Sequence, residues 1–167
     1  MADEVLAVLK ASPPRRVLGV GTVLMLGALA VYVALFEPPG HPGWTAFLIA
    51  LGLTALWLSN KMRHATMAHL ELTRSELRSS TGEVLVRVAD VEQLERGALA
   101  FKPSNGFMLK LRAGSDAGPR RWEPGLWWRM GRRVGIGGVT PGSQARVMAE
   151  LLTQMMAQHA AERQDKR

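Results

Sequence analysis

The sequence contains no cysteine, a single tyrosine and few aromatic residues, which make up 6% of its 167 positions. The lack of cysteine excludes disulfides, thiolate metal sites and a cysteine nucleophile. His64 and His69 are five residues apart, not the four that place two imidazoles on one helix face, and the four histidines form no ligand set. No Ser/His/Asp order or carboxylate pair stands out either. We therefore expect no metal, no cofactor and no catalytic residue, and an enzyme ranks as a distant alternative.

Ionisable residues are also missing from two long apolar stretches near the start of the chain. Residues 17–36 form an uncharged apolar run of 20 residues, and residues 44–58 form a second run of 15. At about 1.5 Å per residue, the first run covers about 30 Å, the thickness of a bilayer core. The second run can span by extending through Ser59 and Asn60 or by thinning the bilayer locally. The pattern predicts a hairpin of two membrane spans, 17–36 and 43–60. Pumps and channels need ionisable groups inside their spans. Because these two spans have none, the hairpin is expected to be an anchor or a docking surface.

Basic residues flank this hairpin on one side. Lys10, Arg15 and Arg16 precede the first run and Lys61 and Arg63 follow the second, whereas the connection 37–43 has neither Lys nor Arg. The positive-inside rule places both termini in the cytoplasm and the short loop outside. Small residues at four-residue spacing, Ala30/Ala34 and Ala46/Ala50, would allow close contact between the two helices.

The remaining chain divides into three parts. Residues 1–16 form a cytoplasmic N-terminal segment, in which Asp3 to Leu9 is either a short amphipathic interfacial helix or a frayed terminus. Residues 66–160 form a cytoplasmic domain, and 161–167 form a charged tail. Within the domain, short strand-like segments alternate with turn signals: 70–73, 75–78, 83–88, 99–103, 106–112, 121–123, 126–130 and 132–137. Ser104-Asn105 is a candidate hairpin turn.

The last segment predicts a helix. Thr140 is a suitable N-cap with Pro141 at the first helical position. Apolar residues then recur at helical spacing on one wide face: Val147, Met148, Leu151, Leu152, Met155 and Met156.

An antiparallel sheet followed by one amphipathic C-terminal helix resembles pleckstrin-homology-like (PH-like) domains, in which the helix caps an open end of a strongly bent sheet. Two spans followed by such a domain resemble the small bacterial membrane proteins that carry bacterial PH domains. The resemblance implies an α+β membrane protein: a two-helix transmembrane hairpin followed by a PH-like bent antiparallel sheet with a C-terminal helix. It implies an interaction module and supplies no catalytic residues.

The positive charge is concentrated in one part of the domain. Nine basic and two acidic residues lie between Arg96 and Arg133, so this segment accounts for the whole formal net charge of +7. Within it, arginines and tryptophans alternate closely, and these are the candidate residues for binding a lipid or a partner: Arg120, Arg121, Trp122, Trp127, Trp128, Arg129, Arg132 and Arg133. Such a patch could contact anionic head groups, and the same residue types are enriched at protein interfaces. Alternatively, the tryptophans fill the core while the arginines face water.

Glycines between Gly131 and Val139 invite comparison with a phosphate-binding loop. The segment lacks the Gly-Lys-Ser/Thr ending of such a loop, and a dinucleotide fingerprint needs a strand–turn–helix unit. We therefore favour a structural role, in which these glycines relieve crowding in a bent strand or before the last helix.

Two non-catalytic functions are compatible with these features. The leading hypothesis is an inner-membrane protein whose PH-like domain binds or helps to assemble a larger membrane protein complex. The alternative is a membrane-surface sensor of anionic lipid. We expect membrane lipids and a protein complex as partners; nucleic acid is a weaker choice for a chain tethered to a membrane.

Overall fold

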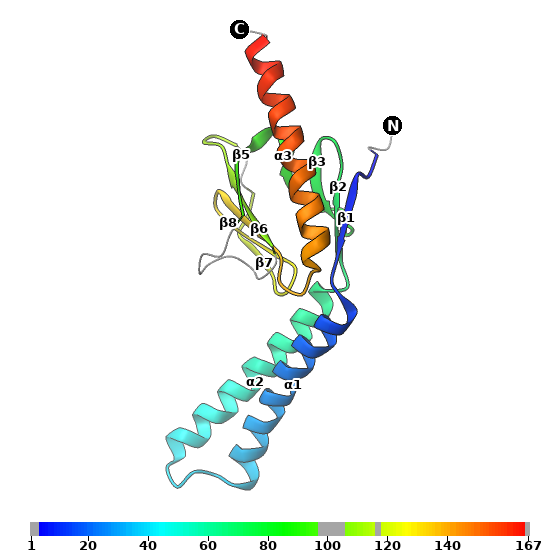
Figure 1. The fold of residues 1–167 in the computed structure, drawn as a ribbon. Helices are drawn as coiled ribbons and strands as arrows, with labels where there is room; N and C mark the ends of the chain where they lie inside the picture. Colours follow the sequence, from blue (N-terminus) through cyan, green and yellow to red (C-terminus); the bar gives the residue numbers. More distant parts are fainter. Residues whose placement is uncertain (1–3, 97–105, 116–117, 166–167) are drawn as a thin grey trace.

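A computed structural model describes residues 4–96, 106–115 and 118–165 (Figure 1). Two long apolar helices, α1 (Pro13–Phe36) and α2 (Pro42–Ala65), extend from one end of a sheet domain, and a third helix, α3 (Gly142–Asp165), lies along that domain. The chain is therefore an α+β protein. The expected strand 99–103 and the Ser104-Asn105 turn lie outside the described residues.

The described strands form two antiparallel sheets. The first has the order β1-β2-β3-β4 and the second β5-β6-β9-β8-β7. The strands of the first sheet are β1 (Ala7–Lys10), β2 (His69–Leu72), β3 (Glu76–Ser79) and β4 (Val84–Arg87). Those of the second are β5 (Val91–Glu95), β6 (Phe107–Leu111), β7 (Arg121–Glu123), β8 (Trp127–Met130) and β9 (Arg133–Ile136). A short 3₁₀ turn, η1 (Val88–Asp90), connects the two sheets. Most strands fall where the alternating patterns predict them, but in two sheets rather than one.

The strand β1 departs from the prediction. Residues 7–10 are extended and pair with β2, with Lys10 opposite His69 and Leu9 opposite Leu70. The expected amphipathic helix over Asp3–Leu9 is therefore wrong, because alternating burial on a sheet also satisfies this short apolar segment. Leu9 is fully buried while Val8 is 37% exposed. The domain thus includes a strand that precedes the hairpin in sequence.

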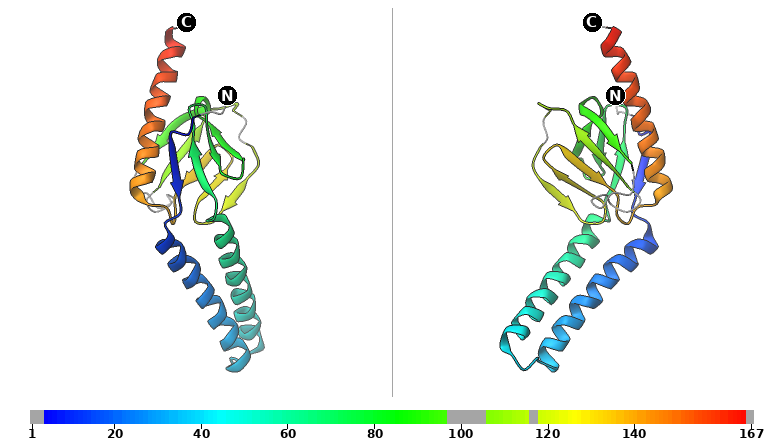
Figure 2. Two further views of the ribbon diagram at one scale, coloured as in Figure 1. Left: turned by 90° about the vertical axis from the view of Figure 1, so that its right-hand side faces the viewer. Right: turned by 60° about the vertical axis from the view of Figure 1, so that its left-hand side comes forward.

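The helical hairpin is consequently an insertion between two neighbouring strands of one sheet. Two residues, 11–12, join β1 to α1, and three, 66–68, join α2 to β2. Both views in Figure 2 show α1 and α2 leaving the same end of the domain side by side. The hairpin thus connects the adjacent antiparallel strands β1 and β2, which a short β-turn would otherwise join.

The two long helices pack against each other through glycines. A Cβ atom at Gly27 would lie 3.0 Å from the Ala55 side chain, and one at Gly52 would lie 2.9 Å from the Gly27 carbonyl oxygen. Ser59 donates a hydrogen bond of 3.0 Å to the Val20 carbonyl. Ala34 is buried as predicted. In contrast, the predicted contact through Ala46 and Ala50 is wrong, since both residues are exposed.

Both helices are long and apolar enough to cross a membrane, judged by length and composition. Only 11% of each apolar window is buried within the chain. A core helix of a water-soluble domain would be mostly buried, and these two helices are mostly exposed.

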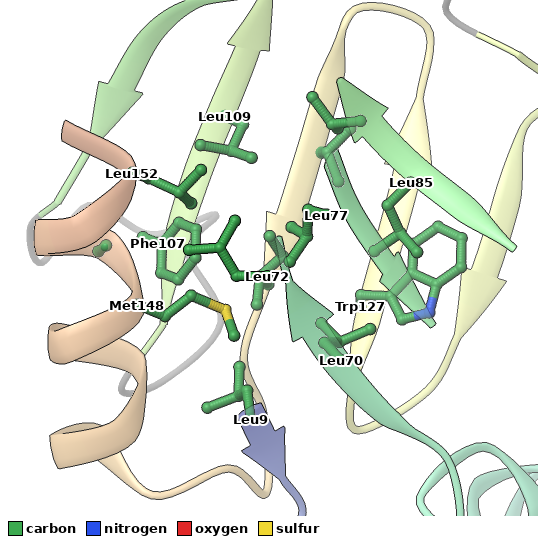
Figure 3. Packing of buried hydrophobic residues seen from close by; sticks show 14 of the residues in the cluster. Leu9, Leu70, Leu72, Leu77, Leu85, Phe107, Leu109, Trp127, Met148 and Leu152 are labelled. Carbon is green, nitrogen blue, oxygen red and sulfur yellow. The ribbon is translucent and has the colours of Figure 1, made fainter. Parts of the chain in front are cut away.

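The hydrophobic core lies between the two sheets and beneath α3 (Figure 3). Leu70, Leu72 and Leu77 enter it from the first sheet, and Phe107 and Leu109 enter from the second. The helix α3 contributes Ala145, Met148, Ala149 and Leu152, all at most 3% exposed.

The prediction of an amphipathic C-terminal helix is confirmed by α3, with two differences. Val147 is 53% exposed and lies outside the buried face. Thr140 does not cap the helix: its hydroxyl is buried without a hydrogen-bond partner in the described part of the chain. The first helical hydrogen bond instead joins the Ala145 amide to the Pro141 carbonyl.

Candidate docking surface

Six of the eight predicted arginine and tryptophan residues lie on three neighbouring strands, β7, β8 and β9, while Arg120 precedes β7 and Arg132 lies in the turn between β8 and β9. Trp122 pairs with Trp128, Arg121 pairs with Arg129, and Trp128 pairs in turn with Gly135. Because successive side chains of a strand point to opposite faces, the segment does not form one patch. The pairing separates the candidates into an inward and an outward group.

Two candidates are structural. Trp127 is 2% exposed and belongs to the core. Arg129 is 5% exposed, and its guanidinium donates hydrogen bonds to the carbonyls of Leu85 (3.0 Å) and Pro119 (3.1 Å). Its Nη2 also lies 3.8 Å from Glu83 Oε1. Arg129 therefore connects β8 to β4 of the other sheet, and its guanidinium is already engaged by partners within the chain.

Two further arginines are engaged in ion pairs. Arg121 lies 3.2 Å from Glu83 and 3.5 Å from Glu123. Arg132 donates to the Leu111 carbonyl (2.9 Å) and pairs with Glu92 at 3.1 Å. Carboxylates thus neutralise much of the charge that the sequence concentrates in this segment.

Arg120 and Arg133 are exposed, and neither forms an ion pair within residues 4–96, 106–115 and 118–165. Arg133 pairs across the sheet with Met130, which is 62% exposed. Trp122 is 44% exposed, and the Trp128 indole lies directly over Gly135, where any side chain would collide with it. We call Trp122, Trp128, Met130 and Arg133 the outer face.

A hollow of about 520 Å³ adjoins this face and is lined by Arg120, Arg121, Trp122, Arg129, Met130 and Gly131. Its rim combines exposed apolar surface with the guanidinium of Arg120. Tryptophan, methionine and arginine are the residue types that are enriched at protein interfaces.

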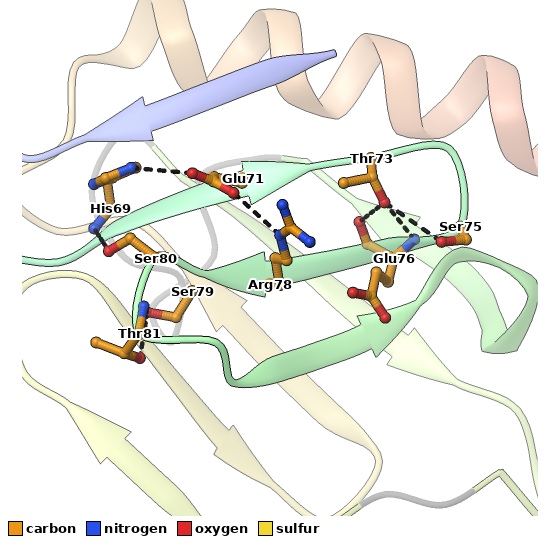
Figure 4. A network of polar contacts seen from close by, with 9 residues as sticks. All are labelled: His69, Glu71, Thr73, Ser75, Glu76, Arg78, Ser79, Ser80 and Thr81. Carbon is orange, nitrogen blue, oxygen red and sulfur yellow. Dashed lines mark hydrogen bonds and ion pairs between the residues drawn. The ribbon is translucent and has the colours of Figure 1, made fainter. Parts of the chain in front are cut away.

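The polar residues of the first sheet behave differently (Figure 4). Glu71 accepts from Arg78 at 3.1 Å and lies 3.3 Å from His69, whose backbone amide donates to the Ser80 hydroxyl. These groups satisfy one another along β2 and β3. This network is a surface feature of the sheet rather than a ligand site.

An additional contact joins the second sheet to α2. The Lys61 ammonium lies 5.4 Å from the centre of the Trp57 ring and 5.0 Å from that of Trp122. Sequence reasoning missed this arrangement because Trp122 lies far from α2 in the chain. The four-residue spacing of Trp57 and Lys61 was the available signal, since it places both residues on one helix face.

The basic residues that flank the hairpin gather at the end nearest the domain. Ser59 contacts Val20, and because the helices run antiparallel, the residues before Val20 lie level with those after Ser59. Arg15, Arg16, Lys61 and Arg63 therefore surround the same end of the helix pair. Arg15 also donates to the Thr140 carbonyl at 3.0 Å, at the start of α3.

The glycines of the 131–139 segment have structural roles, in agreement with the sequence-based interpretation. Gly131 has a φ of 55° in the turn between β8 and β9. Gly138 has a φ of 121°, and a Cβ atom there would lie 2.7 Å from the Gly125 carbonyl oxygen. In the part of the chain that is described, no group of three or more His, Asp or Glu residues could hold a metal ion.

Comparison of the chain with protein-family models, with curated proteins and with solved structures gave no match. The geometry of the chain itself must therefore support any functional proposal.

Proposed function

We propose that this chain is a non-catalytic, two-span protein of a bacterial inner membrane whose domain binds or helps to assemble a larger membrane protein complex. α1 and α2 form the transmembrane hairpin, and both termini and the domain lie in the cytoplasm. The cluster of basic residues at the domain end of the hairpin and their absence from the 37–43 loop support this orientation.

The domain is proposed to be PH-like. Two antiparallel sheets around one core, with a C-terminal helix packed beside them, support this assignment. The hairpin would then be an insertion after the first strand of the PH-like domain rather than an anchor that precedes the whole domain.

The observation that carries the functional proposal is the set of contacts between the domain and the hairpin. Besides the two short connections, the Ser12 amide donates to the Val139 carbonyl at 2.9 Å. On the other side, Gly125 packs against α2 so closely that a Cβ atom would lie 3.0 Å from the Thr66 side chain. The strand pair β1–β2 and these contacts hold the domain against the hairpin, which supports a fixed orientation of the outer face relative to the proposed membrane.

A fixed orientation suits docking onto another membrane protein. A lipid sensor on a flexible tether gains from reorientation, whereas a docking subunit gains affinity when less freedom is lost on binding. The outer face offers exposed Trp122, Met130 and Arg133 for such a contact. The competing hypothesis of a lipid sensor depends on a broad patch of free arginines. Arg121 and Arg132 form ion pairs and Arg129 is buried, so the patch is smaller than that hypothesis requires.

Co-purification tests the proposal. The full chain is extracted from its native membrane in a mild detergent, and proteins that remain with it in fixed stoichiometry are identified. The double variant Met130→Asp/Arg133→Glu should lose that partner, because it places negative charge on the outer face. Arg87→Glu, an exposed change on β4 of the other sheet, is the control and should keep the partner. Equal retention by both variants would contradict docking through the outer face.

A further inference from the structure

The fold brings the ammonium group of Lys61 close to two indole rings, those of Trp57 and Trp122. Trp57 lies one helical turn before Lys61 on α2, and Trp122 approaches from the edge strand β7. No carboxylate lies within ion-pair distance of Lys61 in the described residues. The charge therefore has aromatic neighbours and no anion from the described part of this chain.

The Lys61 ammonium donates no hydrogen bond within residues 4–96, 106–115 and 118–165. A lysine ammonium carries three donors, and each indole carries one N–H. Neither indole N–H donates a hydrogen bond within the described segments. Two aromatic rings hold the cation in place through cation–π attraction. The ammonium and the two indole N–H groups therefore have no hydrogen-bond acceptor among the described residues.

The surroundings of Lys61 indicate which acceptor would fit. The residues Leu53, Trp57 and Lys61 follow one another at four-residue spacing on a single face of α2. Leu53 is 57% exposed and Trp57 is 58% exposed. Ala50, one turn before Leu53 on the same side, is also exposed. An apolar stripe therefore ends at a cation flanked by tryptophans, the arrangement expected where acyl chains meet head groups.

We propose that Lys61, Trp57 and Trp122 form a binding site for the phosphate of a phospholipid in the leaflet next to the domain. The phosphate oxygens accept from the Lys61 ammonium and the indole N–H groups, and an acyl chain lies along Leu53 and Ala50. This inference rests on the proposed membrane insertion of the hairpin. It differs from a general attraction of the domain for anionic surfaces, because it assigns one lipid to one side chain.

A site of this kind would have a structural consequence. Trp122 belongs to the domain and Trp57 to the hairpin, so a phosphate held by both joins the two parts. The bound lipid would add a further connection on the side of α2, opposite the Ser12–Val139 and Arg15–Thr140 contacts on the side of α1.

Native mass spectrometry of the full chain tests the site. The protein is released from nanodiscs containing phosphatidylglycerol or the phosphate-free lipid diacylglycerol, and the number of lipids retained per chain is measured against lipid concentration. The wild-type chain should retain one phosphatidylglycerol and no diacylglycerol. Lys61→Gln should weaken retention about tenfold, the loss expected for a charge-assisted hydrogen bond.

The matched control is Arg63→Gln, which removes the same charge from an exposed position of α2 two residues away. It should retain the lipid as the wild-type chain does. Trp122→Leu, which keeps the lysine and an apolar side chain, should also weaken retention. Thermal unfolding of each variant in nanodiscs establishes that the chain is folded.

Three results would overturn the proposal. Equal losses in Lys61→Gln and Arg63→Gln would indicate diffuse charge attraction. Equal retention of diacylglycerol would indicate apolar packing alone, and displacement of the lipid by millimolar inorganic phosphate would indicate a free-phosphate site. Failure to find a protein partner in co-purification would leave the lipid result unaffected, so the two proposals fail separately.

Discussion

Removal of β1 should destabilise the domain, because this strand, which precedes the hairpin, is part of the first sheet and of the core. Leu9 is fully buried in the core, and β1 is hydrogen-bonded to β2 along residues 7–10. Truncation of a fully buried leucine to alanine costs about 2–5 kcal/mol, and each lost backbone hydrogen bond costs about 0.5–1.5 kcal/mol net. Because a domain is stable by about 5–15 kcal/mol, loss of the whole strand should unfold it or leave it marginally stable.

Two shortened chains without the hairpin test this magnitude. The first is residues 66–167 alone. The second joins residues 4–10 to residues 69–167 through a two-residue Asn-Gly turn, which suits the direct pairing of Lys10 with His69. Urea unfolding followed by circular dichroism should show a cooperative transition for the joined chain and none, or one at much lower urea, for residues 66–167.

Point variants in the joined chain refine the test. Leu9→Ala should lower the free energy of unfolding by about 3 kcal/mol, whereas Val8→Ala, on the exposed side of the same strand, should change it by less than about 1 kcal/mol. If residues 66–167 unfold with the same midpoint as the joined chain, or if the two alanine variants are equivalent, β1 is not part of the domain.

Three further predictions concern the seam between the sheets, the helix pair and the topology. Glu83→Gln removes the carboxylate beside the buried Arg129, and it should lower the free energy of unfolding by about 3 kcal/mol in urea melts; a change below about 0.5 kcal/mol would contradict the role of this pair. Gly52→Val should lower the melting temperature in nanodiscs, because its side chain would collide with α1, while Gly21→Val, whose Cβ meets nothing within 4 Å, should not. A cysteine at Gly40 in this cysteine-free chain should react with a membrane-impermeant maleimide in intact cells; labelling only after lysis would contradict the proposed orientation.

Local patterns in the sequence are sufficient to predict much of the fold. The apolar runs predict α1 and α2, and the helical spacing of Met148 and Leu152 predicts α3. Most strands follow from alternation and turn residues, because each of these signals depends on residues close together in the chain.

The features that escaped prediction depend on distant pairing. The segment around Leu9 is too short for the spacing of its apolar residues to distinguish a strand from a helix. Its pairing with β2, which follows the hairpin in the sequence, makes it a strand. Similarly, the composition indicates that Arg129 and Trp127 are candidate binding residues. It does not predict that both are buried, because burial depends on which face of β8 points inward. The spacing of Trp57 and Lys61 is visible in the sequence, but the approach of Trp122 to Lys61 is not, since it depends on the position of β7 relative to α2.

The most direct test of the central proposal is the distance between the hairpin and the domain in a bilayer. Spin labels on cysteines at Gly40, in the interhelical loop, and Arg87, exposed on β4, allow this distance to be measured by double electron–electron resonance in nanodiscs. A domain fixed by β1, β2 and the contacts of Ser12 and Gly125 should give one narrow distance distribution, which broadens when flexible glycine-serine segments are inserted at 11–12 and 66–68. A broad distribution in the unmodified chain would contradict a domain that is held in one orientation for docking.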